Sequence, residues 1–140
     1  MLKEIETVKN RLIDGDFTCV LFINGLEFVS KERGVKPLIN FLKSSNSFVG
    51  AIAGDKTVGA GAAYLYALLG VKSVWANVVS KRAESVLKQY GIDLYYGELV
   101  PYIINRKGDG VCPIEQSVSD AKSPEHAYEL ILEKLKQLNG

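Results

Sequence analysis

Apolar residues recur along the first part of the chain at spacings that distinguish helix from strand. Residues 2–14 carry them three or four positions apart with charged residues between, which predicts an amphipathic helix. Residues 17–23 and 26–30 are largely apolar runs on either side of Asn24 and Gly25. Both residues of that pair tolerate positive φ, so the pattern predicts a β-hairpin with a tight turn.

From residue 48 onward, apolar strand-like runs alternate with helical patterns. Such alternation predicts parallel strands joined by helices that cover both faces of a sheet, to which the hairpin adds an antiparallel element. We therefore expect one domain over residues 1–140, an α/β protein built as a three-layer α/β/α sandwich on a mixed sheet. The expected strands span residues 48–54, 71–79 and 92–96, with an extended stretch over 99–104. The expected helices span 36–43, 57–69, 81–90 and 124 onward, and Ser80 and Ser123 are expected to cap the last two.

The composition excludes several broad classes of protein. Hydrophobic residues make up 47% and charged residues 24% of the chain, which is ordinary for a folded domain. Lys and Arg number 17 against 16 Asp and Glu, so no strong positive field attracts nucleic acid. No apolar run reaches the roughly 18 residues needed to cross a bilayer. We expect neither nucleic acid nor membrane as a partner.

The two cysteines lie far apart and in different contexts. Cys19 sits in an apolar run and is expected to be buried, whereas Cys112 directly precedes Pro113. The charged N-terminus lacks the apolar segment of a signal peptide. We therefore expect a cytoplasmic protein with reduced thiols rather than a disulfide.

The segment 105–115 combines glycines, a cysteine and a proline in an order that folding alone does not require. Its two glycines loosen the backbone around Asp109, and Cys112 then stands where Pro113 can open a helix. A helix N-terminus offers unpaired N–H groups and a partial positive charge, which favour an anion or an ionised thiol. The segment reads Asn105-Arg106-Lys107-Gly108-Asp109-Gly110-Val111-Cys112-Pro113-Ile114-Glu115.

Two interpretations of this segment stay open. In the functional one, Cys112 is a nucleophile or acid favoured by Arg106 and Lys107 and opposed by Glu115. In the structural one, Cys112 is a packed cap residue and residues 108–110 form a tight turn. The functional interpretation makes four residues candidate ligand-binding groups: Asn105, Arg106, Asp109 and Glu115.

Asp55 and Lys56 are the other candidate site residues. They follow the strand expected over 48–54 and precede the helix expected from residue 57, where ligands bind in parallel sheets. Lys56 could stabilise an anion and Asp55 could act as a base, although Asp55 could equally be a helix cap and Lys56 a solvated surface charge. We expect Asp55, Lys56 and the loop around Cys112 to lie together at one end of the sheet.

Two glycines inside the expected helix over 57–69 need an explanation. Each costs about 1 kcal/mol relative to alanine in a helix interior. Close packing of the helix on the sheet explains Gly59 and Gly61 most simply, and a ligand approaching the backbone is the alternative.

His126 is the only histidine of the sequence. Its place in the first turn of the last helix indicates a surface or capping residue.

The chain resembles a small uncharacterised bacterial family, a domain of unknown function whose fold is similar to that of cytidine deaminases. Beyond the order of elements, three motifs carry the resemblance, which spans nearly the whole chain and implies a cytidine-deaminase-like sandwich. They are Lys-Glu-Arg-Gly at 31–34, Gly-Asp-Lys at 54–56, and Pro-Tyr-Ile-Ile-Asn-Arg-Lys-Gly-Asp-Gly-Val-Cys-Pro-Ile-Glu at 101–115.

The activity of the deaminases does not transfer with the fold. Zinc deaminases place His-x-Glu or Cys-x-Glu at one helix start and Pro-Cys-x-x-Cys at the next. The matching stretches here, 55–58 and 80–84, contain no cysteine or histidine. We expect no zinc, no other cofactor and no hydrolytic deamination of cytidine or adenosine.

Three functions are compatible with these patterns. The first is a zinc-independent pocket that acts on a small nucleotide-like or carbonyl ligand. Cys112 would be its nucleophile or acid, Lys56 would stabilise charge, and Asp55, Asp109 or Glu115 would carry the proton. The second is a non-catalytic ligand-binding or sensor domain that keeps the pocket. The third is a protein-interaction module that pairs through a sheet edge or helix face, with copies of itself as one kind of partner.

Overall fold

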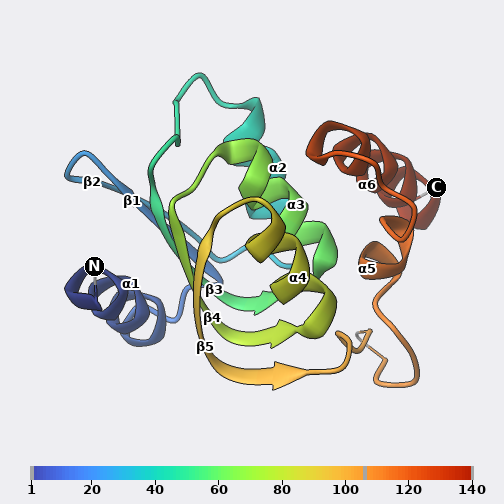
Figure 1. Ribbon diagram of the computed structural model, residues 1–140, viewed down its shortest axis with the longest axis horizontal. Helices are drawn as coiled ribbons and strands as arrows, with labels where there is room; N and C mark the ends of the chain where they lie inside the picture. The colour runs from blue at the N-terminus through green and yellow to red at the C-terminus, as the bar shows by residue number, and fades with distance from the viewer. Residues whose placement is uncertain (1, 106, 140) are drawn as a thin grey trace.

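The protein is built on one five-stranded mixed sheet with helices on both faces (Figure 1). The computed structural model describes residues 2–105 and 107–139. The strand order is β2-β1-β3-β4-β5, in which β1 is antiparallel to both of its neighbours and β3, β4 and β5 are parallel. The strands are β1 (Cys19–Ile23), β2 (Leu26–Ser30), β3 (Ile52–Val58), β4 (Ser73–Ser80) and β5 (Asp93–Val100).

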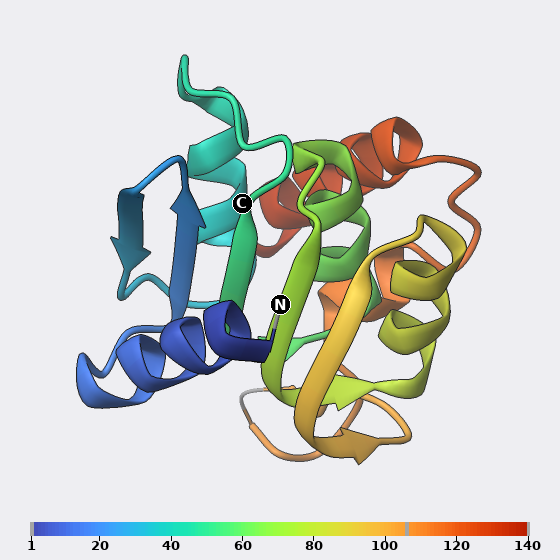
Figure 2. The same ribbon diagram turned by 60° about the vertical axis from the view of Figure 1, so that its left-hand side comes forward.

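The helices form layers on either side of the sheet. α1 alone packs on one face, where it contacts β1, β3 and β4. α2, α3 and α4 cover the other face, and α5 and α6 pack on the outer side of α3 (Figures 1 and 2). The expected α/β/α sandwich is confirmed. The helices are α1 (Leu2–Asp14), α2 (Lys36–Lys43), α3 (Ala60–Leu69), α4 (Lys81–Gln89), α5 (Pro113–Ser117) and α6 (Pro124–Asn139).

Local signals in the sequence define several of these elements correctly. Asn24 and Gly25 both have positive φ, 50° and 77°, and join β1 to β2 as the hairpin pattern predicts. Ser80 caps α4, since its side chain accepts a hydrogen bond from the N–H of Ala83. The Ser123 hydroxyl accepts a bond from the third residue of α6 in the same way.

The boundary between β3 and α3 differs from the expectation. Residues 48–51 form a turn in which Gly50 has φ 88°, so the strand begins at Ile52 rather than at residue 48. β3 continues to Val58, because Asp55 and Thr57 keep parallel register with β4. Helix α3 consequently begins at Ala60, three residues later than residue 57. β5 is also longer than expected and ends before Pro101.

Helix α3 is buried on almost every side, because the sheet covers one side and α5 and α6 cover the other. The helix therefore shows little amphipathic character and consists mainly of alanine, leucine and tyrosine. A Cβ on Gly61 would lie 2.8 Å from Cγ2 of Ile114, and one on Gly59 would lie 3.1 Å from Oε2 of Glu115. The glycines thus allow close approach of the α5 segment rather than of the sheet, which corrects the expected explanation.

Trp75 contributes to the smaller of two apolar clusters, the one beneath α1, and is 6% exposed.

None of the described helices is both long and apolar enough to cross a membrane.

Candidate functional site

Two helix N-termini lie side by side at the carboxyl end of the parallel strands. α3 begins at Ala60 immediately after β3, and α4 begins at Lys81 immediately after β4. The strands are neighbours in the sheet and the two helices contact each other. Unpaired N–H groups and the helix dipoles make such an edge favourable for negative charge.

The side chain of Glu115 fills this position. Its Oε2 accepts a hydrogen bond of 2.7 Å from the N–H of Ala60 and another from the hydroxyl of Ser80. Its Oε1 accepts a bond of 2.8 Å from the N–H of Ile103. The guanidinium of Arg82 donates to the Glu115 backbone carbonyl at 2.9 Å. Glu115 is 2% exposed, so the chain's own carboxyl group satisfies the donors at the two helix starts.

Cys112 lies at the edge of this cluster as the N-cap of the five-residue helix α5, with Pro113 in the first turn as expected. Its N–H donates to the carbonyl of Ile103 at 2.8 Å, which ties the α5 segment to the same residue that Glu115 contacts. The thiol is half-buried and caps no backbone group. In the described part of the chain, no side chain forms a hydrogen bond with it.

The loop before Cys112 is a small closed turn. Ile104 and Val111 form an isolated antiparallel bridge. The side-chain amide of Asn105 donates to Asp109 at 2.9 Å, and the N–H of Asp109 donates to the Asn105 side chain at 3.2 Å. Asn105 and Asp109 therefore stabilise the turn through each other, as the structural interpretation of this segment describes. Arg106 lies outside the described residues.

Asp55 faces the core instead of a loop. It lies directly opposite Cys19 of β1 in the sheet, and its Oδ2 accepts a 2.6 Å hydrogen bond from the hydroxyl of Tyr66 on α3. The Cys19 sulfur lies 3.4 Å from the same hydroxyl. Burial raises the pKa of Asp55 to about 7, although the bonds from Tyr66 and from backbone N–H groups oppose that shift. Burial and the nearby Asp55 also raise the pKa of Cys19 and of Tyr66.

Lys56 points to the other side of the sheet. Successive residues of a strand alternate between faces, so Lys56 lies on the face opposite Asp55. Its ammonium group forms an ion pair of 3.2 Å with Asp16, which follows α1. The structure therefore brings Glu115 and Cys112 to the helix starts but does not bring Lys56 there. The expectation that these residues converge fails because Asp55 and Lys56 belong to the strand itself.

Sequence reasoning assigned no site role to Ser80 or to Tyr66. Ser80 was expected only as a cap for α4, but its hydroxyl also donates to Glu115. Tyr66 stands inside an apolar helix, and only a tertiary contact reveals its bond to Asp55. His126, half-buried in the first turn of α6, accepts a hydrogen bond from the N–H of Lys122, which agrees with a capping role.

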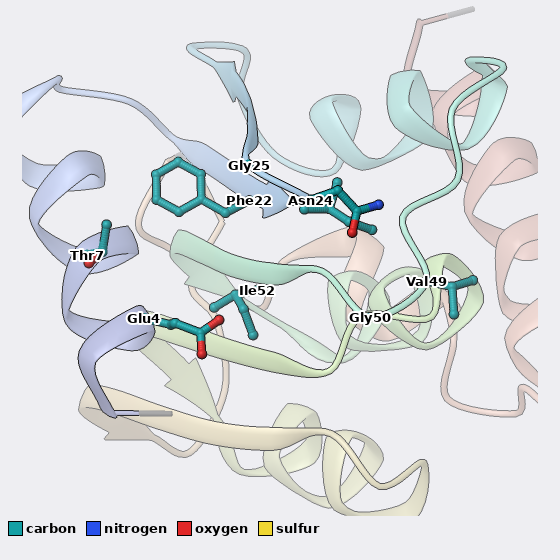
Figure 3. Close-up of a pocket in the computed structure, with 9 residues that line it drawn as sticks. Glu4, Thr7, Phe22, Asn24, Gly25, Val49, Gly50 and Ile52 are labelled. Carbon is teal, nitrogen blue, oxygen red and sulfur yellow. The ribbon is translucent and has the colours of Figure 1, made fainter.

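Two open depressions of the surface lie away from the helix starts. The larger, about 410 Å³, lies where the β1–β2 turn, the start of β3 and the first turns of α1 meet (Figure 3). Phe22 and Ile52 supply apolar surface there, and Glu4 and Asn24 supply polar groups. The smaller, about 330 Å³, lies between α4 and β5. Neither is lined by any of the six described residues among those proposed from sequence as site residues.

The difference in burial between the two cysteines gives a testable expectation. Cys19 is 1% exposed and its raised pKa disfavours the reactive thiolate, whereas Cys112 is half-buried at a helix start. In the folded protein we expect iodoacetamide to modify Cys112 at least about tenfold faster than Cys19. Mass spectrometry after a timed pulse measures both rates. Equal rates below the unfolding transition would contradict the assignment, and full denaturation should remove the difference.

The sheet order, the position of its helices and the paired helix starts define a protein of the cytidine-deaminase-like α/β fold. The chain belongs to the family described as a domain of unknown function (DUF1893), whose model matches residues 7–135. A DUF1893 family protein from Thermotoga maritima, TM1506, has a crystal structure with a TM-score of 0.83 and 26% sequence identity, covering 96% of this chain and 90% of that one. The apo dCMP deaminase of the cyanophage S-TIM5 has a TM-score of 0.50 and 17% identity, covering 69% and 98%. Among curated proteins, no sequence matches this chain.

The residues at the helix starts do not fit the zinc ion of the deaminases. α3 begins with Gly59 and Ala60, and α4 begins with Ser80 and Lys81, none of which is a zinc ligand in these enzymes. Throughout residues 2–105 and 107–139, no three His, Cys, Asp or Glu side chains are grouped closely enough to hold a metal ion.

Proposed function

We propose that this protein is a non-catalytic binding domain for a small anionic, nucleotide-like ligand. The observation that carries the proposal is the convergence of three hydrogen-bond donors on the Glu115 carboxyl group. The donors are the N–H groups of Ala60 and Ile103 and the hydroxyl of Ser80. They come from three separate segments of the chain, and the same set suits a phosphate or carboxylate of a ligand.

In the absence of a ligand, the carboxylate of Glu115 occupies the position where the anion of the ligand would bind. A ligand anion enters by displacing the Glu115 side chain, so its affinity depends on competition between two anions for one set of donors. The nucleotide-like character is an analogy at the level of the fold, since the cyanophage protein with a similar fold is a dCMP deaminase. The analogy selects the first compounds to test.

A binding role is favoured over a catalytic one by the surroundings of the candidate nucleophile. A cysteine nucleophile needs a base within hydrogen-bond reach, and no described side chain forms such a bond with Cys112. Asp55 accepts a hydrogen bond from the hydroxyl of Tyr66. The ammonium group of Lys56 donates to the carboxylate of Asp16. Glu115 is 2% exposed and already accepts three hydrogen bonds from the protein, so its carboxyl group is held in a structural network rather than presented to a substrate.

Thermal denaturation with cytidine monophosphate, cytidine and inorganic phosphate tests this proposal. Glu115→Gln keeps the size of the side chain but removes the competing charge, so the nucleotide should raise the Tm of this variant by several degrees more than that of the unmodified protein. A ligand at a hundred times its Kd stabilises a protein by about 2.7 kcal/mol. Glu129→Gln, at an exposed position of α6, is the matched control and should behave like the unmodified protein.

The series of compounds separates the possible results. Stabilisation by the nucleotide but not by the nucleoside supports recognition through the anion. If the Glu115→Gln variant gains nothing from either phosphate compound, the competition between Glu115 and a ligand does not exist and the proposal is wrong.

A further inference from the structure

The strand β5 forms a long, unpaired edge of the sheet (Figure 2). It pairs with β4 on one side and has no described strand on the other. The N–H of Asp93 bonds to the carbonyl of Lys72 on the β4 side. Because backbone groups of successive strand residues point in opposite directions, those of Leu94, Tyr96 and Glu98 point outward, away from β4. The edge therefore presents a row of free donors and acceptors over eight residues.

This edge lacks several of the features by which monomeric proteins usually protect an edge strand. Such strands are short, or they carry charged side chains, above all lysine, or proline or a bulge. β5 contains no lysine and no proline, and its charged residues are Asp93 and Glu98. Its residues pair with β4 at one constant offset, and within this stretch only Asn77 and Gly97 do not pair. Tyr96 adds an aromatic side chain that is 43% exposed. The opposite edge, β2, is only five residues long.

The sequence of β5 is complementary to itself in one antiparallel register. A two-fold axis perpendicular to the sheet would place the β5 strands of two copies antiparallel to each other. Each face of one sheet would then continue into the same face of the other, so paired residues have their side chains on the same face. With Gly97 on the axis, Tyr96 faces Glu98 of the second copy, Tyr95 faces Leu99 and Leu94 faces Val100. Apolar side chains meet apolar ones, and the tyrosine hydroxyl can donate to the carboxylate.

The neighbouring registers are unfavourable. An axis at Glu98 places two glutamates opposite each other, and an axis at Tyr96 places Leu94 opposite Glu98. The glycine on the axis of the favoured register has no side chain to hinder the approach of its counterpart. Beside the edge, the depression between α4 and β5 is lined by Glu84, Lys88 and Asp93, so the charges that it presents to a second copy are of both signs.

We propose that two copies of this protein associate in solution through their β5 edges into a continuous ten-stranded sheet, in the register centred on Gly97. Sedimentation velocity tests the proposal, since a dimer has twice the chain mass of 15.4 kDa. Tyr96→Glu introduces a carboxylate opposite Glu98 on both sides of the axis and should produce monomers. Adding Glu98→Lys to that variant replaces the repulsion with two ion pairs and should restore the dimer.

The control variant is Leu26→Glu, which places the same charge on the exposed edge strand β2 and should leave the dimer intact. Circular dichroism establishes that each variant is folded before its mass is compared. A monomeric unmodified protein at 50–100 µM (about the range in which weak dimers form) overturns the proposal. Dissociation by Leu26→Glu, or failure of Glu98→Lys to rescue Tyr96→Glu, overturns the proposed edge or its register.

Discussion

Replacing Glu115 by alanine should lower the free energy of unfolding by roughly 3–5 kcal/mol. The side chain is 2% exposed and accepts bonds from Ala60, Ser80 and Ile103. Truncation leaves these three donors in the interior without a partner, and each buried donor left unpaired costs about 1–3 kcal/mol. Urea denaturation followed by circular dichroism measures the loss.

Glu115→Gln refines this prediction. Its amide oxygen can take the place of Oε2 and keep the bonds from Ala60 and Ser80, while its NH₂ group faces the N–H of Ile103 and loses that bond. The loss should therefore be less than half of that for alanine. Glu129→Ala, at an exposed position, should change stability by less than about 0.5 kcal/mol. A Glu115→Ala variant as stable as this control would show that the three bonds contribute little.

The stability of the protein should fall as pH rises from about 4 to about 8, and Asp55 should cause much of that fall. Burial raises the pKa of this carboxyl group from 3.8 to about 7. Between these two values the folded state binds a proton that the unfolded state has lost, so the free energy of unfolding decreases with pH. The penalty is absent below the unfolded pKa and complete above the folded one. Its full size is on the order of 4 kcal/mol.

Asp55→Asn isolates this contribution because its side chain does not titrate. We expect the difference in unfolding free energy between the variant and the unmodified protein to shift in favour of the variant as pH rises through this window. Chemical denaturation at four values between pH 4.5 and 8 measures it. Asp120→Asn, at an exposed site, should produce no such shift. Parallel pH profiles for the unmodified protein and Asp55→Asn would refute the pKa assigned to Asp55.

Local sequence signals predicted the architecture well where turn and cap chemistry fixes the backbone. The Asn24-Gly25 hairpin and the Ser80 cap depend on the conformational preferences of a few adjacent residues, and both are confirmed. The start of α3 was placed too early, because Asp55 and Thr57 carry no local signal for strand pairing. Their extended conformation comes from the register with β4, which is a tertiary interaction.

The candidate site was predictable only where local sequence signals define it. The Cys112-Pro113 pair correctly indicated a helix start, and Glu115 was identified as a candidate. Which donors Glu115 meets depends on segments up to 55 positions away, and no local pattern in the sequence specifies them. The separation of Asp55 from Lys56 follows once both are assigned to a strand, since alternate side chains then point to opposite faces.

The burial of α3 between the sheet and α6 has a consequence for synthesis of the protein. Leu69 ends α3 and Pro124 begins α6, 55 positions later in the chain. At about 5–20 residues per second, a ribosome needs roughly 3–10 seconds to make that stretch. Until residue 113 is made the outer face of α3 has no covering helix, and after that only the short α5 can pack there until α6 is complete. The nascent chain therefore exposes its most apolar helix until α6 emerges from the ribosome, and chaperones that recognise apolar segments have that interval in which to bind it.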